Sequence, residues 1–213
     1  MNERLNFIFD EIPACETFAD IACDHGYIAD AMLKADKCKK AFVADISDRS
    51  LMKAQKLLKD FIDAGKCESF VSDGFKNVPQ ADVALIAGIG GILTIEILTA
   101  AAVLPDTLVL QPMKHCEKVR RAVVSMGYFI KKDFTFKAEG QFYDLIVAVK
   151  GKDFLTEEEA EFGRTNVEEY PAAFREKMAC EIAKINEYCS RDGIGEKTKA
   201  RLLKDAERLK KYV

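Results

Sequence analysis

Five short segments of this 213-residue sequence place acidic, glycine or amide residues directly after a run of apolar residues. If each run is a strand of a parallel sheet, the five segments meet at one edge, which is where such sheets bind ligands. Each segment alone also fits a turn, because turns favour Gly, Asp and Pro. Their combination predicts a ligand site. The segments are Asp20 with Ala22-Cys23-Asp24-His25-Gly26, Asp45, Asp73-Gly74, Gly88-Ile89-Gly90-Gly91 and Gln111-Pro112.

The first segment has the position of a nucleotide-binding loop but lacks two of the three glycines of G-x-G-x-x-G. Those glycines let the backbone approach a pyrophosphate, whereas Asp24 would repel one. The segment therefore argues against NAD. It favours a ligand that carries positive charge and no phosphate, such as the sulfonium and ammonium groups of S-adenosylmethionine. Gly26 is expected to leave room for the next helix to approach.

The later segments suggest contacts for a nucleoside. Asp45 lies 25 residues after Asp20, where a carboxylate can accept both ribose hydroxyls. A capping role is less favoured because Ser47 and Asp48 already offer caps. Asp73 could accept from an adenine amino group, although an Asp-Gly turn explains it nearly as well.

The glycines at 88–91 have no G-K-[ST] after them, so they do not form a phosphate loop. They are expected to let a flat substrate approach the backbone, and a packing turn is the alternative. His25 receives a role because of its place in the first segment, and His115 receives none. Cys23 is interpreted as a small core residue.

The elements that would position these residues alternate between strand and helix. Strands are predicted over 17–22, 41–46, 68–74, 81–91 and 107–112, and helices over 27–36, 47–65, 92–104 and 117–127. A β-hairpin follows over 128–140 and 141–151. This pattern predicts an α/β fold with helices on both faces of a mostly parallel, seven-stranded sheet that contains one antiparallel strand.

After Gly151 the pattern becomes helical, with apolar residues from Phe174 to Cys189 and from Leu202 to Val213, separated by a break over 190–195. This predicts an antiparallel helical hairpin. We therefore expect two domains, 1–150 and 151–213. The segment 153–169 is acidic and the segment 197–213 is basic, an asymmetry that can mark a nucleic-acid surface or a solvated helix face.

The composition is that of an ordinary soluble protein, with 49% hydrophobic residues, 31% charged residues and a net charge of −3. No apolar run reaches the ~20 residues of a membrane span, and the first residues do not form a signal peptide. Seven Cys without a C-x-x-C pair and only two His argue against a metal site and for reduced thiols in the cytoplasm.

These motifs resemble those of the bacterial tRNA (adenine(22)-N(1))-methyltransferases. DIACDHGYIAD resembles the family's D-I-G-S-D-H-A-Y-L-P, ADISDRSLMKA its second-strand motif, IAGIGGILTIEIL its I-A-G-M-G-G with a following helix, LVLQPM its L-I-L-Q-P, and EGQFYDLIVA its closing hairpin. The resemblance covers residues 2–150 well and the helical hairpin loosely. Ala22 and Cys23 replace Gly-Ser, Ile89 replaces Met, and SDRS replaces a common N-x-G-P.

The resemblance implies a class I fold, S-adenosylmethionine as cofactor, tRNA as partner and methyl transfer to N1 of an adenine, expected to be adenine 22. N1 carries a neutral lone pair, so alignment matters more than a strong base. A carboxylate, with Asp24 as the best candidate, could stabilise the charge that develops on the base. The base must be unpaired or flipped out to expose N1. The absence of [DN]-P-P-[YF] after the fourth strand agrees with attack by a ring nitrogen.

We assign two sets of site residues. The cofactor set is Asp20, Ala22, Asp24, Gly26, Tyr27, Asp45, Ile46, Asp73, Gly74, Ala87 and Gly88, and the catalytic set is Asp24, His25, Gly88, Gly90, Gln111 and Pro112. Two alternatives stay open: a class I methyltransferase that acts on a small molecule or a protein, and a non-catalytic RNA-binding module that keeps the fold.

Overall fold

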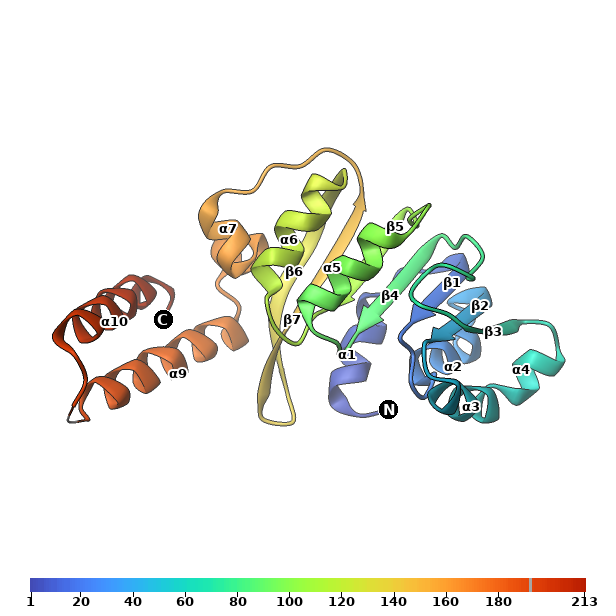
Figure 1. Ribbon diagram of the computed structural model, residues 1–213, viewed down its shortest axis with the longest axis horizontal. Coiled ribbons are helices and arrows are strands. Elements are labelled where there is room, and N and C mark those ends of the chain that lie inside the picture. Colours follow the sequence, from blue (N-terminus) through green and yellow to red (C-terminus); the bar gives the residue numbers. More distant parts are fainter. Residues whose placement is uncertain (192) are drawn as a thin grey trace.

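The computed structural model describes residues 1–191 and 193–213, and a seven-stranded sheet lies at its centre (Figure 1). The strand order is β3-β2-β1-β4-β5-β7-β6, and β7 runs antiparallel to both of its neighbours. The predicted α/β class and the single antiparallel strand are thus confirmed. The strands are β1 (Cys15–Ile21), β2 (Cys38–Asp45), β3 (Cys67–Val71), β4 (Val83–Ala87), β5 (Thr107–Gln111), β6 (Tyr128–Ala138) and β7 (Gln141–Lys150).

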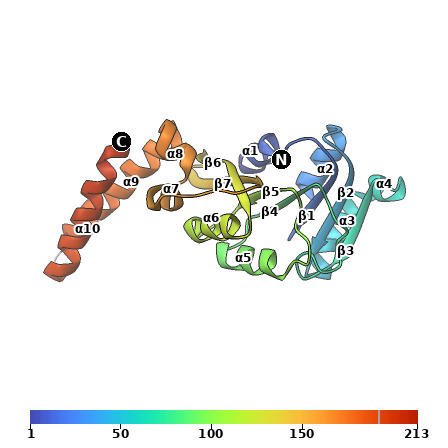
Figure 2. The same cartoon turned by 90° about the horizontal axis from the view of Figure 1, so that it is seen from above.

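Helices cover both faces of this sheet (Figure 2). One buried cluster joins the sheet to α1, α2 and α3, through residues such as Ile8, Ile28 and Leu51. A second cluster joins the opposite face to α5 and α6, through Ile97 and Val119. The helices of these layers are α1 (Glu3–Glu11), α2 (Tyr27–Lys34), α3 (Asp48–Leu57), α4 (Lys59–Asp63), α5 (Gly91–Ala100) and α6 (Cys116–Ser125).

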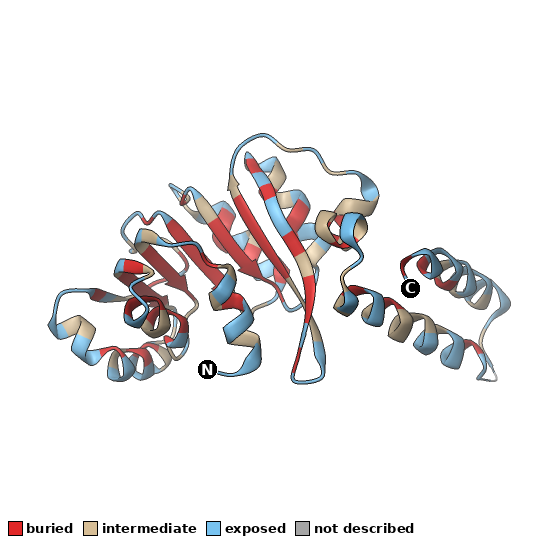
Figure 3. Ribbon diagram, turned by 180° about the vertical axis from the view of Figure 1, so that it is seen from behind, coloured by how far each residue is buried: buried red, intermediate tan, exposed pale blue. Residues whose placement is uncertain are grey.

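The central strands are apolar on both sides because both sides are covered, as in other parallel sheets. Phe18 of β1 belongs to the first cluster, whereas its neighbour Ala19 belongs to the second. The buried residues in Figure 3 accordingly concentrate in the sheet. The parallel register pairs Phe18 with Ala41 of β2 and Val83 of β4, so the strands end together at one edge.

Helix starts agree better with the predictions than helix ends do. Ser47 caps α3, since its side chain accepts from the backbone N–H of Ser50 at 3.2 Å. The predicted helix over 47–65 is divided at Leu58 into α3 and α4. The helix predicted over 92–104 ends at Ala100, and the following residue is extended. Pro105 explains why helix does not continue to Leu104, because the residue before proline disfavours helical backbone.

Three helices were not predicted. Asn2 begins α1 by accepting from the backbone N–H of Leu5 at 2.9 Å. After β7 come two short helices, α7 (Glu157–Phe162) and α8 (Arg164–Glu169). A capping box of Thr156 and Glu159 starts α7.

The segment after β7 packs on the β6 side of the sheet: α8 contacts β6, the outermost strand, and α7 contacts α6. Three backbone N–H groups of β6 donate to side chains of this region: Ile130 to Asp153 (2.9 Å), Asp133 to Thr165 (3.1 Å) and Thr135 to Asn166 (2.9 Å). The predicted boundary at residue 151 therefore does not coincide with a break in the packing.

A buried ion pair lies beneath these helices. Arg120 of α6 donates to Asp133 of β6 at 2.8 Å, and both side chains are almost fully buried. The same guanidinium donates to the carbonyls of Ala160 and Glu161 in α7. Gly163 permits this approach, because a Cβ there would lie 2.5 Å from the Asp133 carboxylate. Residues 157–169 thus cover this ion pair and give the guanidinium two further acceptors in its buried position.

The chain ends in two long helices, α9 (Ala172–Cys189) and α10 (Glu196–Leu209), which pack together and extend away from the sheet (Figure 2). Of the predicted break over 190–195, Asp192 lies outside the described residues. Phe162, Phe174 and Tyr212 form an aromatic cluster that joins the hairpin to α7. Leu203 is 42% exposed and Val213 62% exposed, so the predicted apolar stripe of the last helix is only partly buried. No helix in the part of the chain that the structure describes has the length and apolar character needed to cross a membrane.

Candidate functional site

A cavity of about 430 Å³ lies where β1, β2 and β4 end. Eight predicted residues line it: Asp20, Ala22, Asp24, His25, Tyr27, Asp45, Ala87 and Gly88. The other lining residues are Asn2, Arg4, Leu5, Cys23, Ile28, Leu85 and Ile89. Side chains from four separate segments therefore converge on one volume at the expected edge of the sheet, which we call the first cavity.

The loop between β1 and α2 shapes one wall of the first cavity. Its backbone is left-handed at Ala22 (φ 58°), Asp24 (φ 45°) and Gly26 (φ 71°). Gly26 does not line the cavity. A Cβ at Gly26 would lie 3.0 Å from Ala54 of α3, so this glycine allows α2 to start close to α3.

Two side chains contact the Asp24 carboxylate. Its carboxylate contacts His25 Nδ1 at 2.6 Å and Lys53 Nζ at 3.1 Å. Partial burial raises the pKa of Asp24, but the hydrogen bond from Lys53 and the charge of His25 outweigh this and lower it. The His25 ring stacks on Tyr27, with centroids 5.2 Å apart. Asp24 is thus held as a carboxylate beside the Lys53 ammonium group and the His25 ring.

Asp20 lies at the bottom of the first cavity and is only 5% exposed. Burial raises its pKa to about 7, and the neighbouring charge of Asp45 also raises it, while a hydrogen bond from the backbone of Ala29 lowers it. A cation placed in the cavity would favour the ionised form of this carboxyl group.

Asp45 is held in place by two backbone groups. Its Oδ1 accepts from the N–H of Ser47 at 2.8 Å, and its Oδ2 accepts from the N–H of Asp24 at 3.3 Å. Each carboxylate oxygen retains acceptor capacity for a further donor. The two contacts therefore orient the carboxylate toward the cavity without saturating it.

The glycines after β4 have different roles. Gly88 has a φ of 79° and lines the first cavity, as expected of a position that a ligand approaches closely. Gly91 is a packing residue instead, because a Cβ there would lie 2.4 Å from the carbonyl oxygen of Lys114. Gly90 has open space around it and does not line the first cavity. Of these three glycines, Gly91 thus has the packing role that was predicted as the alternative to substrate contact.

Gln111 is fully buried and does not line the first cavity. Its Oε1 accepts from Arg4 Nη1 at 2.5 Å. Arg4 in turn lines the cavity beside Gly88 and lies 5.8 Å from the ring centroid of Tyr143. Sequence reasoning missed Arg4 together with helix α1. The signal was the Asn2 cap followed by apolar residues at positions 5, 8 and 12.

Four further predicted residues lie outside the first cavity: Ile46, Asp73, Gly74 and Pro112. Ile46 is 71% exposed beside it. Asp73 forms an ion pair with Lys76 at 2.7 Å, and Gly74 packs closely against Ile97 of α5. Pro112 lines a second cavity of about 460 Å³, formed by segments 112–117 and 141–144 with Glu161 and Lys177.

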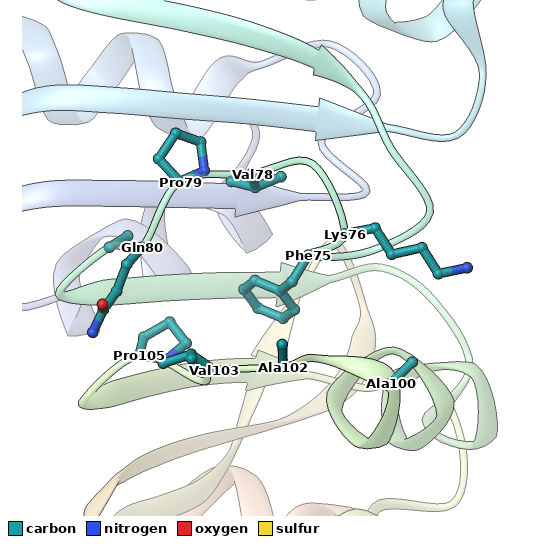
Figure 4. Close-up of a pocket in the computed structure, with 10 residues that line it drawn as sticks. Phe75, Lys76, Val78, Pro79, Gln80, Ala100, Ala102, Val103 and Pro105 are labelled. Atoms are coloured by element: carbon teal, nitrogen blue, oxygen red, sulfur yellow. The ribbon is translucent and has the colours of Figure 1, made fainter.

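A third cavity of about 360 Å³ lies between the connections β3–β4 and α5–β5 (Figure 4). The Phe75 ring points toward Ala102 across it, and Pro79 and Pro105 border it. None of the predicted site residues lines this cavity. Among the described residues, no group of three or more His, Cys, Asp or Glu side chains is placed to hold a metal ion.

Comparisons with known proteins show what the chain is similar to. Residues 1–146 match the family described as "Methyltransferase domain". A Mycoplasma pneumoniae protein named "Putative tRNA methyltransferase" is 30% identical over 165 residues, which cover 74% of this chain and 75% of that protein. The "tRNA (adenine(22)-N(1))-methyltransferase" of Bacillus subtilis is 26% identical over 160 residues, 71% of this chain and 66% of that protein.

Solved structures show the same fold over the whole chain. TrmK of M. capricolum, in complex with S-adenosyl-homocysteine, superimposes with a TM-score of 0.86 at 23% identity, covering 100% of this chain and 97% of that one. A Streptococcus pneumoniae protein described as a putative tRNA (m1A22) methyltransferase gives a TM-score of 0.90 at 20% identity, with coverage of 100% and 99%.

Proposed function

The chain belongs to the methyltransferase-domain family, and we propose that it transfers a methyl group from S-adenosylmethionine to N1 of an adenine in tRNA, with adenine 22 as the target. The observation that supports this most strongly is the convergence of Asp20, Asp24 and Asp45 on the first cavity beside Gly88. The named relatives that act on tRNA support the choice of substrate.

The residues of the first cavity fit S-adenosylmethionine. Asp45 presents oriented acceptor oxygens for the two ribose hydroxyls. Asp20 and Asp24 supply negative charge for a sulfonium and an ammonium group. Asp73 pairs with Lys76 outside the cavity, and its role toward adenine stays a prediction.

S-adenosylmethionine, when bound, supplies an electrophilic methyl group on sulfur. The protein has to align adenine N1 with that methyl group, and holding two reactants in line can supply several kcal/mol. Gly88 leaves room for the flat base at the end of β4. Asp24 stabilises positive charge as it develops on the base, while His25 orients the Asp24 carboxylate. The buried Gln111 acts as a positioning residue, because it holds Arg4 and does not reach the cavity.

The terminal helices are the proposed tRNA-binding element. Five cations of the last helical segment follow one another at three- and four-residue steps, which places them on one face of a helix: Lys197, Arg201, Lys204, Arg208 and Lys211. Arg208 is paired with Glu161 at 2.6 Å and Lys211 is paired with Glu158. The other three are exposed and form no salt bridge within the described residues. The free cations thus lie toward the start of α10, where binding a phosphate backbone would depend on salt.

We place the domain boundary near Pro171 instead of residue 151. Helix α8 packs on β6, and α7 packs on α6 and covers Arg120, so both belong with the sheet domain. Helices α9 and α10 then form the second unit. This division keeps the predicted hairpin and moves residues 151–170, which include α7 and α8, into the catalytic domain.

The experiment that tests this function is a radiolabelled methyl assay with unmodified total tRNA, followed by mass analysis of the released nucleosides. We expect 1-methyladenosine, and mapping should place it at position 22. Methylation of a protein or small molecule instead would support the first alternative. Cofactor binding without any methyl transfer would support the non-catalytic alternative.

A further inference from the structure

The second cavity lies next to the first but is separate from it. The two share no lining residue. Their walls touch where the N–H of Met113, on the second cavity, donates to the carbonyl of Ile89, on the first, at 2.8 Å. Arg4 stands between them, bound to Gln111 on one side and stacked over Tyr143 on the other. A group bound in the second cavity therefore lies next to the methyl-transfer site but is separated from it by Arg4 and by the backbone at Ile89 and Met113.

Among the charged side chains that line the second cavity, Lys114 has no acidic partner within the described residues. Its three acids each have a basic partner: Glu117 pairs with Arg121 (3.1 Å), Asp144 with Lys177 (2.9 Å) and Glu161 with Arg208 (2.6 Å). Lys114 is exposed and has no carboxylate within 4.0 Å among the residues that the structure describes. An anionic group in this cavity would thus meet Lys114 without having to displace an acid.

The remaining lining is suited to a flat ring. Phe142 and Tyr143 are half-buried, and Met113 is 46% exposed. The Tyr143 ring is fixed by stacking on Phe136, with centroids 5.5 Å apart. Aromatic side chains beside a cation are the combination with which proteins hold single-stranded nucleic acid, through base stacking and phosphate attraction.

We propose that the second cavity binds the tRNA nucleotide adjoining the target adenine, with its phosphate at Lys114 and its base against Tyr143 and Met113. This inference rests on the proposed function. The wall of Arg4 and Gln111 assigns the cavity to the neighbouring nucleotide, because a base held here could not reach the methyl group in the first cavity. Lys177 of α9 also lines the cavity, so one of the two terminal helices contributes directly to this site.

The phosphate contact is tested by Lys114→Ala in the full-length protein. Binding of unmodified tRNA should weaken, and the slope of log affinity against log salt should fall by about 1. The matched control is Lys66→Ala, another exposed lysine, which directly precedes β3 at the far edge of the sheet and lines neither cavity. An unchanged salt slope in Lys114→Ala, or an equal change in Lys66→Ala, would overturn the proposal.

The stacking contact is tested by comparing Tyr143→Ala with Tyr143→Phe. The alanine variant should raise the KM for tRNA roughly five- to hundredfold, while the phenylalanine variant keeps the wild-type value because the ring remains. Affinity for S-adenosylmethionine, measured by calorimetry, should stay within twofold in both. An unchanged KM in Tyr143→Ala contradicts the proposal, and so does a parallel loss of cofactor affinity. If wild-type protein does not methylate tRNA, the proposed function fails instead, and the Lys114 binding measurement still tests the cavity.

Discussion

Replacing Asp20 by asparagine should stabilise the folded protein and at the same time impair its cofactor site. Asp20 is 5% exposed, and burial together with the charge of Asp45 raises its pKa to about 7 from an ordinary value of 3.8. The folded state therefore binds a proton at this site more tightly than the unfolded state does. Asparagine keeps the shape and the acceptor for the backbone of Ala29, but it never ionises.

The sign of the pH dependence follows from proton uptake. Between pH 4 and pH 7 the folded wild type carries more protons at Asp20 than the unfolded chain, so its stability falls as pH rises through this window and levels off above it. One pKa unit corresponds to about 1.4 kcal/mol. Between pH 5 and pH 8.5 the free energy of unfolding of the wild type should thus fall by roughly 3 kcal/mol, because the pKa of about 7 lies two units above pH 5. The free energy of unfolding of Asp20→Asn should not show this fall.

The assay is urea unfolding of both proteins at pH 5 and pH 8.5, without cofactor. We expect the difference in free energy of unfolding between variant and wild type to grow by roughly 3 kcal/mol toward pH 8.5. Asp73→Asn is the matched control, because this aspartate is exposed and lies outside the cavity. A difference that stays constant with pH would refute the reasoning. Calorimetry at pH 8.5 should show weaker S-adenosylmethionine binding by Asp20→Asn despite its greater stability.

Three further outcomes are expected. Asp45→Ala should weaken S-adenosylmethionine binding by about 1–3 kcal/mol through the loss of charged hydrogen bonds, and calorimetry that finds wild-type affinity would contradict the ribose role. Asp24→Asn should lower turnover more than stability, since Asp24 is partly exposed in a loop. His25→Ala should lower turnover less than Asp24→Asn does. A wild-type methylation rate for Asp24→Asn would exclude the catalytic role of Asp24. A protein that ends at residue 170 should keep its cofactor affinity in calorimetry and lose tRNA binding in filter assays, and efficient methylation by it would show that α9 and α10 are dispensable.

The sheet was predictable because its strands are apolar on both faces and end in residues with clear turn chemistry. Asp20, Asp45 and Gly88 illustrate this, since each follows such a run and each lines the first cavity. Helix starts could also be predicted where a capping residue was present, as at Ser47. Asp73 and Gln111 have the same kind of position at strand ends, but their side chains turn to Lys76 and to Arg4. Strand-end position therefore locates an edge of the sheet, whereas the direction of each side chain depends on its tertiary neighbours.

The missed parts depend on contacts between residues distant in sequence. Arg4 reaches the site through Gln111, which is 107 residues away, and no local pattern signals that pairing. Helices α7 and α8 are too short for a clear helical period, and their acidic residues suggested a solvated segment. Their positions are fixed by Arg120 of α6, which donates to carbonyls of α7, and by Asn166 of α8, which accepts from the N–H of Thr135 on β6. Such long-range pairs require the fold before they can be recognised.

The donors along the outer side of β6 have a consequence for association between copies of this chain. An outermost strand normally presents free N–H and C=O groups to which another strand can add, and this makes it a starting point for aggregation. In this protein Ile130, Asp133 and Thr135 already donate to Asp153, Thr165 and Asn166. The segment after β7 thereby acts as an edge protector, and the sheet cannot be extended at β6 into a continuous sheet of two copies without first detaching it.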